Sequence, residues 1–505
     1  MFKGIKAETK LYLLVLSLAS VFFGILPLLI KPTNPFYIID PGPTYLANAL
    51  EFIQTRRIFM IDHPGTPLVV FLSFVILPIK FVIKLLGFPN FTLWALGNFT
   101  GLYWVSIISV WFVFIVSVFV LHLGVYRLFR SVLVNTFLFL ILFLNPMFLR
   151  MQRIVTPEVF GFFFLSLWFF FVVEYLKKKK IDYLLISSLF AGLAVASKLT
   201  FLFTPAVNLI YSFTKNKKEK MRLVIMSITA GFSGFLLGTV AIYEKYPKFL
   251  GWFGNLLIRT GRSGQEDFGF VNLANIDFGF RTWFGQNPLI FLLIVVSVFL
   301  VLKRAKGSKF WLALFSAGLI GILAFSKYRE AHYQAGNFIL ICIFLTYLFS
   351  MLSNKLKAVV LTLLLLFVVR ELQWDFNNER GEIIQAAKVQ DYVNKLPENS
   401  IIIWELGTTK EYAMIRGRDW SDAFYAEELE QVLPKNWQLY YLDYDLIMDS
   451  YGRLVDISGF CWDGMVMRED ILSEFENYRD NKNKYTYEQI SGTKMYFVRQ
   501  KECKE

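Results

Sequence analysis

The chain has 505 residues, of which 56% are hydrophobic and 54 are phenylalanines. This composition excludes a soluble globular protein and predicts one that crosses a membrane many times. The formal net charge is +13, but much of the excess lies in short basic runs between apolar segments, which argues against nucleic acid as a partner.

Apolar runs of membrane-spanning length recur from the N-terminus to about residue 370. The first run follows a few lysines and lacks a small-residue cleavage site, so we expect a retained signal anchor. The predicted spans are Leu11–Ile30, Gly101–Leu121, Val132–Phe148, Val159–Leu176, Ile181–Ala196, Leu199–Phe213, Leu223–Tyr243, Leu289–Leu302, Phe310–Phe325, Asn337–Ser350 and Ala358–Val369.

The basic runs between the spans predict the orientation of the chain. By the positive-inside rule, the N-terminal lysines and the run Lys177–Lys180 mark the cytoplasmic side. Every basic run falls on that side only if a further apolar stretch, Val69–Leu86, does not cross the membrane. We therefore predict eleven spans with the N-terminus inside. Val69–Leu86 is then juxtamembrane, with Lys80 and Lys84 reaching the outer interface. Twelve spans are the alternative.

The character of the sequence changes after Val369. Residues 371–505 carry charge throughout and contain no run of spanning length. The pattern predicts helices at Glu382–Leu396 and Ala423–Val432, and strands at Ser400–Trp404, Leu439–Leu446, Tyr485–Gln489 and Lys494–Val498. We predict a membrane domain over residues 1–370 and a small extracytoplasmic α/β domain over residues 371–505. The three cysteines indicate neither a zinc site nor a disulfide framework.

Polar residues concentrate in the loop after the first predicted span, between Pro35 and Leu68. Ionisable groups beside a bilayer are costly to desolvate, so a dense cluster of them predicts a site. The cluster contains Asp40, Arg56, Arg57, Asp62 and His63. We expect the long loop Glu244–Pro288 to fold over this first loop and to shape the acceptor side.

The order of residues here resembles the dolichyl-phosphate-mannose–protein mannosyltransferase family, which includes bacterial lipid A aminoarabinose transferases. Asp40 is followed by Tyr45 and Ala49, and then by Asp62-His63-Pro64-Gly65-Thr66-Pro67-Leu68. This last stretch is similar to the family's His-Pro-Pro-Leu element, with Gly65-Thr66 between the prolines.

Further elements follow in the family's order, and the resemblance covers most of residues 11–350. These further elements are Arg153-x4-Glu158, Gly192-Leu193-Ala194 with Lys198, and His332-Tyr333. One departure lies at Leu96–Thr100, where the family commonly has an arginine that contacts the lipid phosphate. The phosphate contacts must then come from other cations, or the donor differs.

The resemblance implies a GT-C type fold and transfer of a sugar from a polyprenyl-phosphate donor to a lipid, glycan or protein acceptor at the plasma membrane. Asp40 is the expected general base, with a helix cap as its structural alternative. His63 and Glu158 are the other expected catalytic residues. Packing in a turn is the alternative for His63, and a favourable position at a helix N-terminus is the alternative for Glu158.

The leaving lipid phosphate needs cations, for which arginine is well suited. The candidates are Arg56, Arg57, Arg153, Lys198 and Arg329, and the residues expected to contact acceptor or sugar are Tyr45, Asp62, His332 and Tyr333. A single acid without a partner does not indicate a divalent metal, so we predict no cofactor and keep a divalent metal as the open alternative.

Two other functions stay open at this point. A transporter or flippase of a lipid-linked or polar solute is the main alternative, although transporters often carry repeated halves and we find no internal repeat. A non-catalytic relative that acts as a scaffold is the third, because the family's arginine is missing.

Overall fold

The structure is a computed structural model. It describes residues 6–29, 35–38, 41–61, 65–214, 217–259, 269, 295, 309–325, 331–397, 400–404, 409–422, 424–433, 437–441, 446–448, 454–456, 461–477 and 484–501. Asp40, Asp62, His63 and Arg329, as well as most of the predicted span Leu289–Leu302, lie outside these ranges. The backbone of His332 is described, and its side chain is not.

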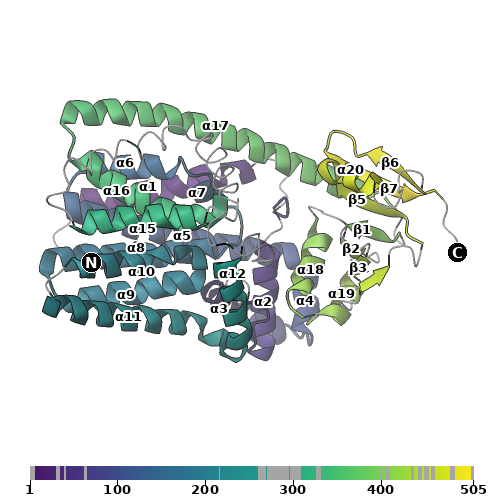
Figure 1. Cartoon of the computed structure of the whole chain (residues 1–505). Coiled ribbons are helices and arrows are strands. Elements are labelled where there is room, and N and C mark those ends of the chain that lie inside the picture. Colours follow the sequence, from purple (N-terminus) through teal and green to yellow (C-terminus); the bar gives the residue numbers. More distant parts are fainter. Residues whose placement is uncertain are drawn as a thin grey trace.

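Long apolar helices lie side by side in one bundle (Figure 1). They are α1 (Ala7–Ile25), α5 (Phe99–Phe129), α6 (Val132–Leu142), α8 (Glu158–Lys178), α9 (Ile181–Ser197), α10 (Phe203–Phe213), α11 (Lys217–Thr239), α15 (Lys309–Phe325), α16 (Ala335–Ser350) and the first part of α17 (Asn354–Val393). Each corresponds to a predicted span. The predicted polytopic helical fold is therefore confirmed, while the number of spans stays a prediction.

Five helical stretches among the described residues are long and apolar enough to cross a membrane. They are Ala7–Leu29, Thr66–Leu85, Phe99–Phe129, Glu158–Lys178 and Glu219–Leu256. Several other bundle helices are apolar but shorter, including α9 and α16. Small residues let such helices approach closely. A Cβ on Gly192 of α9, for example, would overlap the backbone carbonyl of Gly231 in α11.

Helix α3 (Thr66–Leu85) begins and ends at the same end of the bundle. The amide of Gly65, just before α3, donates to the carbonyl of Ser197 at the end of α9 (3.1 Å). Beyond α3, the Asn90 side chain donates to Glu428 in the C-terminal region (3.1 Å). This end, which we call the sheet end, carries the C-terminal strands (Figure 1). The geometry agrees with a juxtamembrane α3, although its length and hydropathy would suffice for a span.

Two more helices cover the sheet end. In Figure 1, α2 (Gly42–Thr55) and α12 (Tyr246–Ile258) run at a steep angle to α8, α9 and α10. The short helix α4 (Phe91–Gly97) lies beside α19 (Ala426–Val432) of the C-terminal region. The opposite end of the bundle carries Lys177–Lys180, and we call it the basic end.

The C-terminal region is a small mixed sheet with helices, as predicted. The strands are β1 (Ile402–Trp404), β2 (Trp437–Tyr441), β3 (Leu446–Met448), β4 (Leu454–Asp456), β5 (Gly464–Arg468), β6 (Tyr485–Gln489) and β7 (Met495–Gln500), in the order β4-β3-β2-β1-β5-β7-β6. Strand β1 pairs in parallel with β2 and β5, and the other pairs are antiparallel. Helices α18 (Lys410–Asp419), α19 and α20 (Glu469–Asn477) complete it.

Two features of this region differ from expectation. The predicted helix Glu382–Leu396 is not a separate element, because α17 continues without a break from the last predicted span to Val393. The domain boundary predicted at residue 370 falls inside this helix and stays a prediction. Cys461 is disulfide-bonded, which the number and spacing of the cysteines did not indicate.

We predict that the two ends of the bundle lie on opposite sides of the membrane, with the basic end inside. Lys178 and Glu427 are both exposed, one at each end. A cysteine introduced at Glu427 should react with a membrane-impermeant maleimide in intact cells. A cysteine at Lys178 should react only after permeabilisation. Labelling of Lys178→Cys in intact cells would contradict the predicted orientation.

Candidate functional site

A buried ion pair joins two helix ends at the sheet end of the bundle. The ammonium of Lys198 contacts a carboxylate oxygen of Glu158, and the hydroxyl of Thr156 donates to the other oxygen. Glu158 is 2% exposed and Lys198 is 4% exposed. A buried charge is costly unless it is paired and hydrogen-bonded, so each of the two residues depends on the other.

The local sequence explains why both side chains lie at helix ends. Pro157 directly precedes α8, and Glu158 is its first residue, where the helix dipole favours a negative charge. Lys198 follows the last residue of α9 with an extended backbone (φ −158°), which turns the chain into η2 (Leu199–Phe201). Helices α8 and α9 pack along one another, so these opposite termini meet.

A third segment reaches the pair from the start of α16. The Lys198 ammonium lies 5.7 Å from the centre of the Tyr333 ring, within the range of a cation–π interaction. Tyr333 belongs to η5 (Ala331–Gln334) and is 3% exposed. The predicted His332-Tyr333 element therefore does meet the predicted Lys198 turn.

The first loop reaches the same place through Gly65. Its φ of +49° is a left-handed conformation that favours glycine, and its amide donates to Ser197, the neighbour of Lys198. A Cβ on Gly65 would overlap the ring of Tyr45, which is buried. Gly65 is thus required both for its backbone angle and for the close approach of Tyr45. Tyr45, Glu158, Lys198 and Tyr333 are the predicted site residues that the structure brings together.

Arg153 takes part in a different cluster. Its Nε donates to the carbonyl of Gly24 (2.6 Å), and both terminal nitrogens bond to the carboxylate of Asp375 in α17. Glu379, one turn further along α17, lies 3.5 Å away. Arg153 is fully buried, and Tyr37 of the first loop packs near it against Ile383 of α17. These contacts give Arg153 a structural role, and its assignment to the lipid phosphate stays a prediction without support from the geometry.

Arg56 and Arg57 are exposed at the far end of α2. Arg56 ends this helix in a left-handed conformation (φ +62°). It lies eleven positions after Tyr45, which is about 16 Å along a helix. The structure therefore places this basic pair away from Lys198 and at the surface.

A second charged cluster lies where α2 meets the C-terminal region. Glu51 of α2 is 7% exposed and interacts electrostatically with Lys245, Asp422 and Arg57. Lys245 lies in η3 (Val240–Lys245), and its ammonium is 4.2 Å from the ring centre of Phe59. The start of the long loop Glu244–Pro288 thus contacts the first loop, as expected. Most of the remaining loop lies outside the described residues.

Burial raises the pKa of Glu51 to about 7. Between the ordinary carboxyl pKa and pH 7, the folded chain holds a proton that the unfolded chain releases. Stability should therefore fall as pH rises through this window, by about 1–3 kcal/mol. Glu51→Gln should flatten this part of the pH profile of thermal unfolding, and Glu427→Gln, an exposed acid nearby, should not. Parallel profiles for Glu51→Gln and the unmodified protein would contradict the assignment.

The sequence analysis did not single out the acids of α17 that surround Arg153. Asp375 and Glu379 are four residues apart just beyond the last predicted span, a spacing that puts two acids on one helix face. That signal was available, whereas nothing in the sequence links Asp375 to Arg153, 222 positions away. Within the described ranges, no group of three histidine, cysteine or acidic residues is arranged to hold a metal ion.

Comparison with known proteins gives the family resemblance a firmer basis. Residues 88–243 match the sequence profile of the family described as dolichyl-phosphate-mannose-protein mannosyltransferase. This segment includes Glu158 and Lys198, and it ends before Tyr333. No curated protein sequence matches the chain.

The fold was also compared with solved structures. The structure of ArnT from Cupriavidus metallidurans in the apo state has a TM-score of 0.54 at 12% identity, over 98% of both chains. ArnT from the same organism bound to undecaprenyl phosphate has a TM-score of 0.51, with the same identity and coverage. An oligosaccharyltransferase from Archaeoglobus fulgidus has a TM-score of 0.45 at 12% identity, over 93% of this chain and 70% of that one.

The predicted resemblance to the mannosyltransferase family and the predicted GT-C fold are confirmed by the profile match and by the ArnT structures. The profile match over residues 88–243 indicates a glycosyltransferase, as expected from the sequence. The apolar helices and this fold indicate an integral membrane protein.

Proposed function

We propose that the protein transfers a sugar from a polyprenyl-phosphate donor to a hydroxyl or amide acceptor at the outer face of the plasma membrane. The observation that carries the proposal is the buried Lys198–Glu158 pair, which lies where the first loop, α8, α9 and α16 meet. Glu158 and Lys198 both fall in the segment that matches the mannosyltransferase profile. One ArnT structure of the same fold holds undecaprenyl phosphate, which supports a donor of this class.

The reaction needs a base and a cationic contact for the leaving group. In the proposed mechanism the Asp40 carboxylate takes the proton of the acceptor, whose oxygen or nitrogen attacks the anomeric carbon of the sugar. The bond from that carbon to the phosphate oxygen breaks, and the polyprenyl phosphate leaves with the electron pair. Lys198 has three N–H donors, of which Glu158 engages one, and the ammonium can therefore also contact the leaving phosphate.

Glu158 acts in this proposal as a positioning residue. Its carboxylate is held by Thr156 and by Lys198, so it fixes the direction of the ammonium rather than serving as a free base. Arg56, Arg57 and Arg329 stay candidates for phosphate contacts, and His63, Asp62 and His332 for catalysis or sugar contact. Tyr45 lies against Gly65 and Tyr333 beside the Lys198 ammonium, and both stay candidates for contact with acceptor or sugar.

The proposal places the sheet end outside the cytoplasm. The disulfide of Cys461 supports this placement, because disulfides persist mainly in oxidising compartments. The acidic and basic residues of the first loop then face the side on which the acceptor arrives. No metal or other cofactor is proposed.

The test is sugar transfer by purified protein in sealed liposomes, with a radiolabelled polyprenyl-phosphate sugar and a panel of lipid, glycan and peptide acceptors. We expect label in the acceptor, together with release of polyprenyl phosphate. A second arm follows movement of the same donor across the bilayer without an acceptor. Movement of the donor in the absence of any transfer would favour the transporter or flippase and overturn the proposal.

A further inference from the structure

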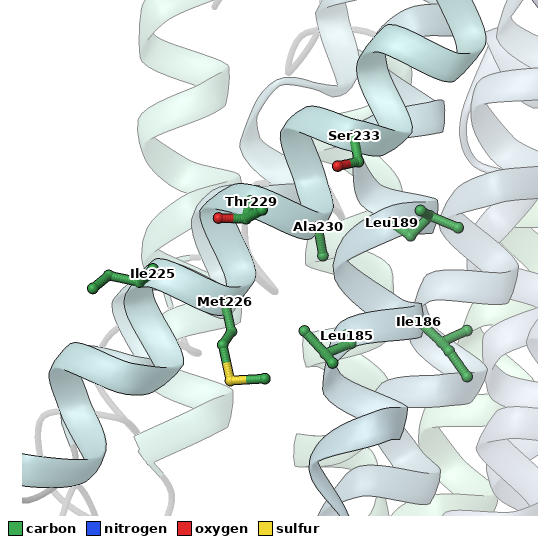
Figure 2. Close-up of a pocket in the computed structure, with 8 residues that line it drawn as sticks. All are labelled: Leu185, Ile186, Leu189, Ile225, Met226, Thr229, Ala230 and Ser233. Carbon is green, nitrogen blue, oxygen red and sulfur yellow. The ribbon is translucent and has the colours of Figure 1, made fainter.

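Two features of the described structure have no part in the proposed mechanism. One is a groove between α9 and α11 (Figure 2). Nothing among the described residues indicates what covers it, and its lining is uncharged: Leu185, Ile186, Leu189, Ile225, Met226, Thr229, Ala230 and Ser233. The other is the side chain of Asn48 in α2, which is fully buried and connects three segments at the sheet end.

The side-chain amide of Asn48 makes four hydrogen bonds. Its nitrogen donates to the carbonyl of Thr44, one turn earlier in α2 (2.9 Å), and to the carbonyl of Trp420 in the C-terminal region (3.1 Å). Its oxygen accepts from the backbone amides of Phe59 (3.0 Å) and Met60 (2.9 Å), which lie in the part of the first loop that follows α2. An asparagine side chain has two N–H donors and an acceptor oxygen with two lone pairs, so all of its bonding positions are used.

The C-terminal region packs on α2 around the same point. Helix α18 lies against α2, and Trp420 follows directly after α18. A Cβ on Gly417 of α18 would lie 3.1 Å from the Cβ of Ala47 and 3.3 Å from the carbonyl oxygen of Pro43. A glycine at this position therefore allows the close approach that brings the Trp420 carbonyl to Asn48.

The same face of α2 reaches the proposed transfer site. Tyr45 precedes Asn48 by three positions, so the two side chains are neighbours on the helix surface. Tyr45 lies against Gly65, whose amide donates to the residue before Lys198. The segment that Asn48 holds ends at Ile61, which is buried and only four positions before Gly65. The amide of Asn48 thus joins the C-terminal region to the part of the first loop that meets the ion pair.

We propose that Asn48 is a positioning residue, through which the C-terminal region holds the first loop at the Lys198–Glu158 pair. This inference rests on the proposed function and adds a role for the C-terminal region. Asn48 itself contacts neither donor nor acceptor. Because a displacement of about 1 Å can lower a rate about 10²-fold, loosening this junction should lower turnover. Donor binding should persist, since the cations of the site are unchanged.

The first arm of the test measures hydrogen exchange of residues 58–61 in the purified full-length protein by mass spectrometry. Asn48→Leu removes the acceptor of two backbone amides, so exchange there should accelerate about tenfold. Gly417→Val leaves Asn48 intact and forces α18 away from α2, so it should accelerate the same segment. Gly381→Val is the matched control, because a Cβ on this glycine of α17 would meet no atom within 4 Å. Unchanged exchange in Gly417→Val would overturn the proposal.

A second control addresses the interior of the C-terminal region. A Cβ on Gly417 would also lie 2.6 Å from the hydroxyl of Tyr425, which donates to the carbonyl of Met414 (2.6 Å). Tyr425→Phe removes this bond without touching α2, and it should leave the exchange of residues 58–61 unchanged. Acceleration in Tyr425→Phe equal to that in Gly417→Val would show that general loosening, rather than the contact with α2, is responsible, and it would overturn the proposal.

The second arm measures kcat, the donor Kd and the midpoint of thermal unfolding. We expect Asn48→Leu and Gly417→Val to lower kcat per folded molecule about 10–100-fold with an unchanged donor Kd. A lower unfolding midpoint with unchanged kcat would show a merely structural role and overturn the proposal. Absence of transfer by the unmodified protein would instead refute the proposed function. The exchange arm would then still decide whether the C-terminal region holds the first loop.

Discussion

Replacing Lys198 with methionine is expected to destabilise the protein and to abolish sugar transfer. The substitution leaves the Glu158 carboxylate buried without its cation, and breaking a buried pair in this way costs about 3–5 kcal/mol. Glu158→Gln should destabilise for the converse reason, because the ammonium then loses its countercharge. The measurements are the midpoint of thermal unfolding in detergent and the rate of transfer from the radiolabelled donor.

The double variant Lys198→Met with Glu158→Gln separates the effect of the ion pair on stability from its effect on sugar transfer. It contains no unpaired buried charge, and the amide of glutamine still accepts from Thr156. We expect it to recover most of the lost stability and to stay inactive, because no ammonium remains to contact the leaving phosphate. An active double variant would show that the pair only holds α8 and α9 together, and it would remove Lys198 from the site.

The bundle could be predicted from the sequence because each helix carries its own signal. An apolar run of sufficient length forms a helix in a membrane whatever its neighbours are, since every backbone group must be satisfied within the segment. For α3 the sequence signals conflict, because its length and hydropathy would suffice for a span while Lys80, Lys84 and the basic loops argue against one, so its juxtamembrane place stays a prediction. In the structure, Gly65 before α3 and Asn90 beyond it both make contacts at the sheet end.

The C-terminal sheet was harder to predict because its strands are short. Strands β3 and β4 have three residues each, too few to show an alternating pattern. Helix α18 has a polar sequence with no clear apolar stripe, and its place is set by packing on α2, where Gly417 lies against Ala47. Such elements depend on distant contacts, which local patterns do not contain.

The site was predictable only in part. Lys198, Glu158 and Tyr333 were singled out one by one through the resemblance, and the structure joins them. The pairing itself could not be foreseen, because a lysine that closes one helix and a glutamate that opens another are 40 positions apart. For Arg153 the geometry gives the predicted phosphate contact no support, and that contact stays a prediction. Its position in the sequence fits a phosphate contact, but the acids of α17 hold it in a buried structural cluster.

Asp40→Asn is expected to lower sugar transfer by about 10²–10⁴-fold while leaving the protein folded and inserted. Asparagine keeps the size of the side chain and also serves well as a helix cap. The N-cap residue of α2 is Pro41, which the substitution does not change, so the start of this helix should be preserved. It cannot take the acceptor's proton, which raises the barrier by several kcal/mol if Asp40 is the base. Donor binding depends on cations and on an apolar surface, so it should persist and be measurable separately with the radiolabelled donor.

Comparison with other variants decides whether the side chain of Asp40 acts as the general base or as a helix cap. Asp40→Ala also removes the base, so it should be as inactive as Asp40→Asn. A lower stability than that of Asp40→Asn would show that the side chain also caps the chain before α2, whose N-cap residue is Pro41. Asp62→Asn tests the neighbouring acid of the same loop, and Arg57→Ala should weaken donor binding without the same loss of turnover at saturating donor. If Asp40→Asn turns over at a near-normal rate, the carboxylate of Asp40 is not the base. A loss confined to Asp62→Asn would then assign that role to Asp62, because a transfer of this kind still requires a group that accepts the proton.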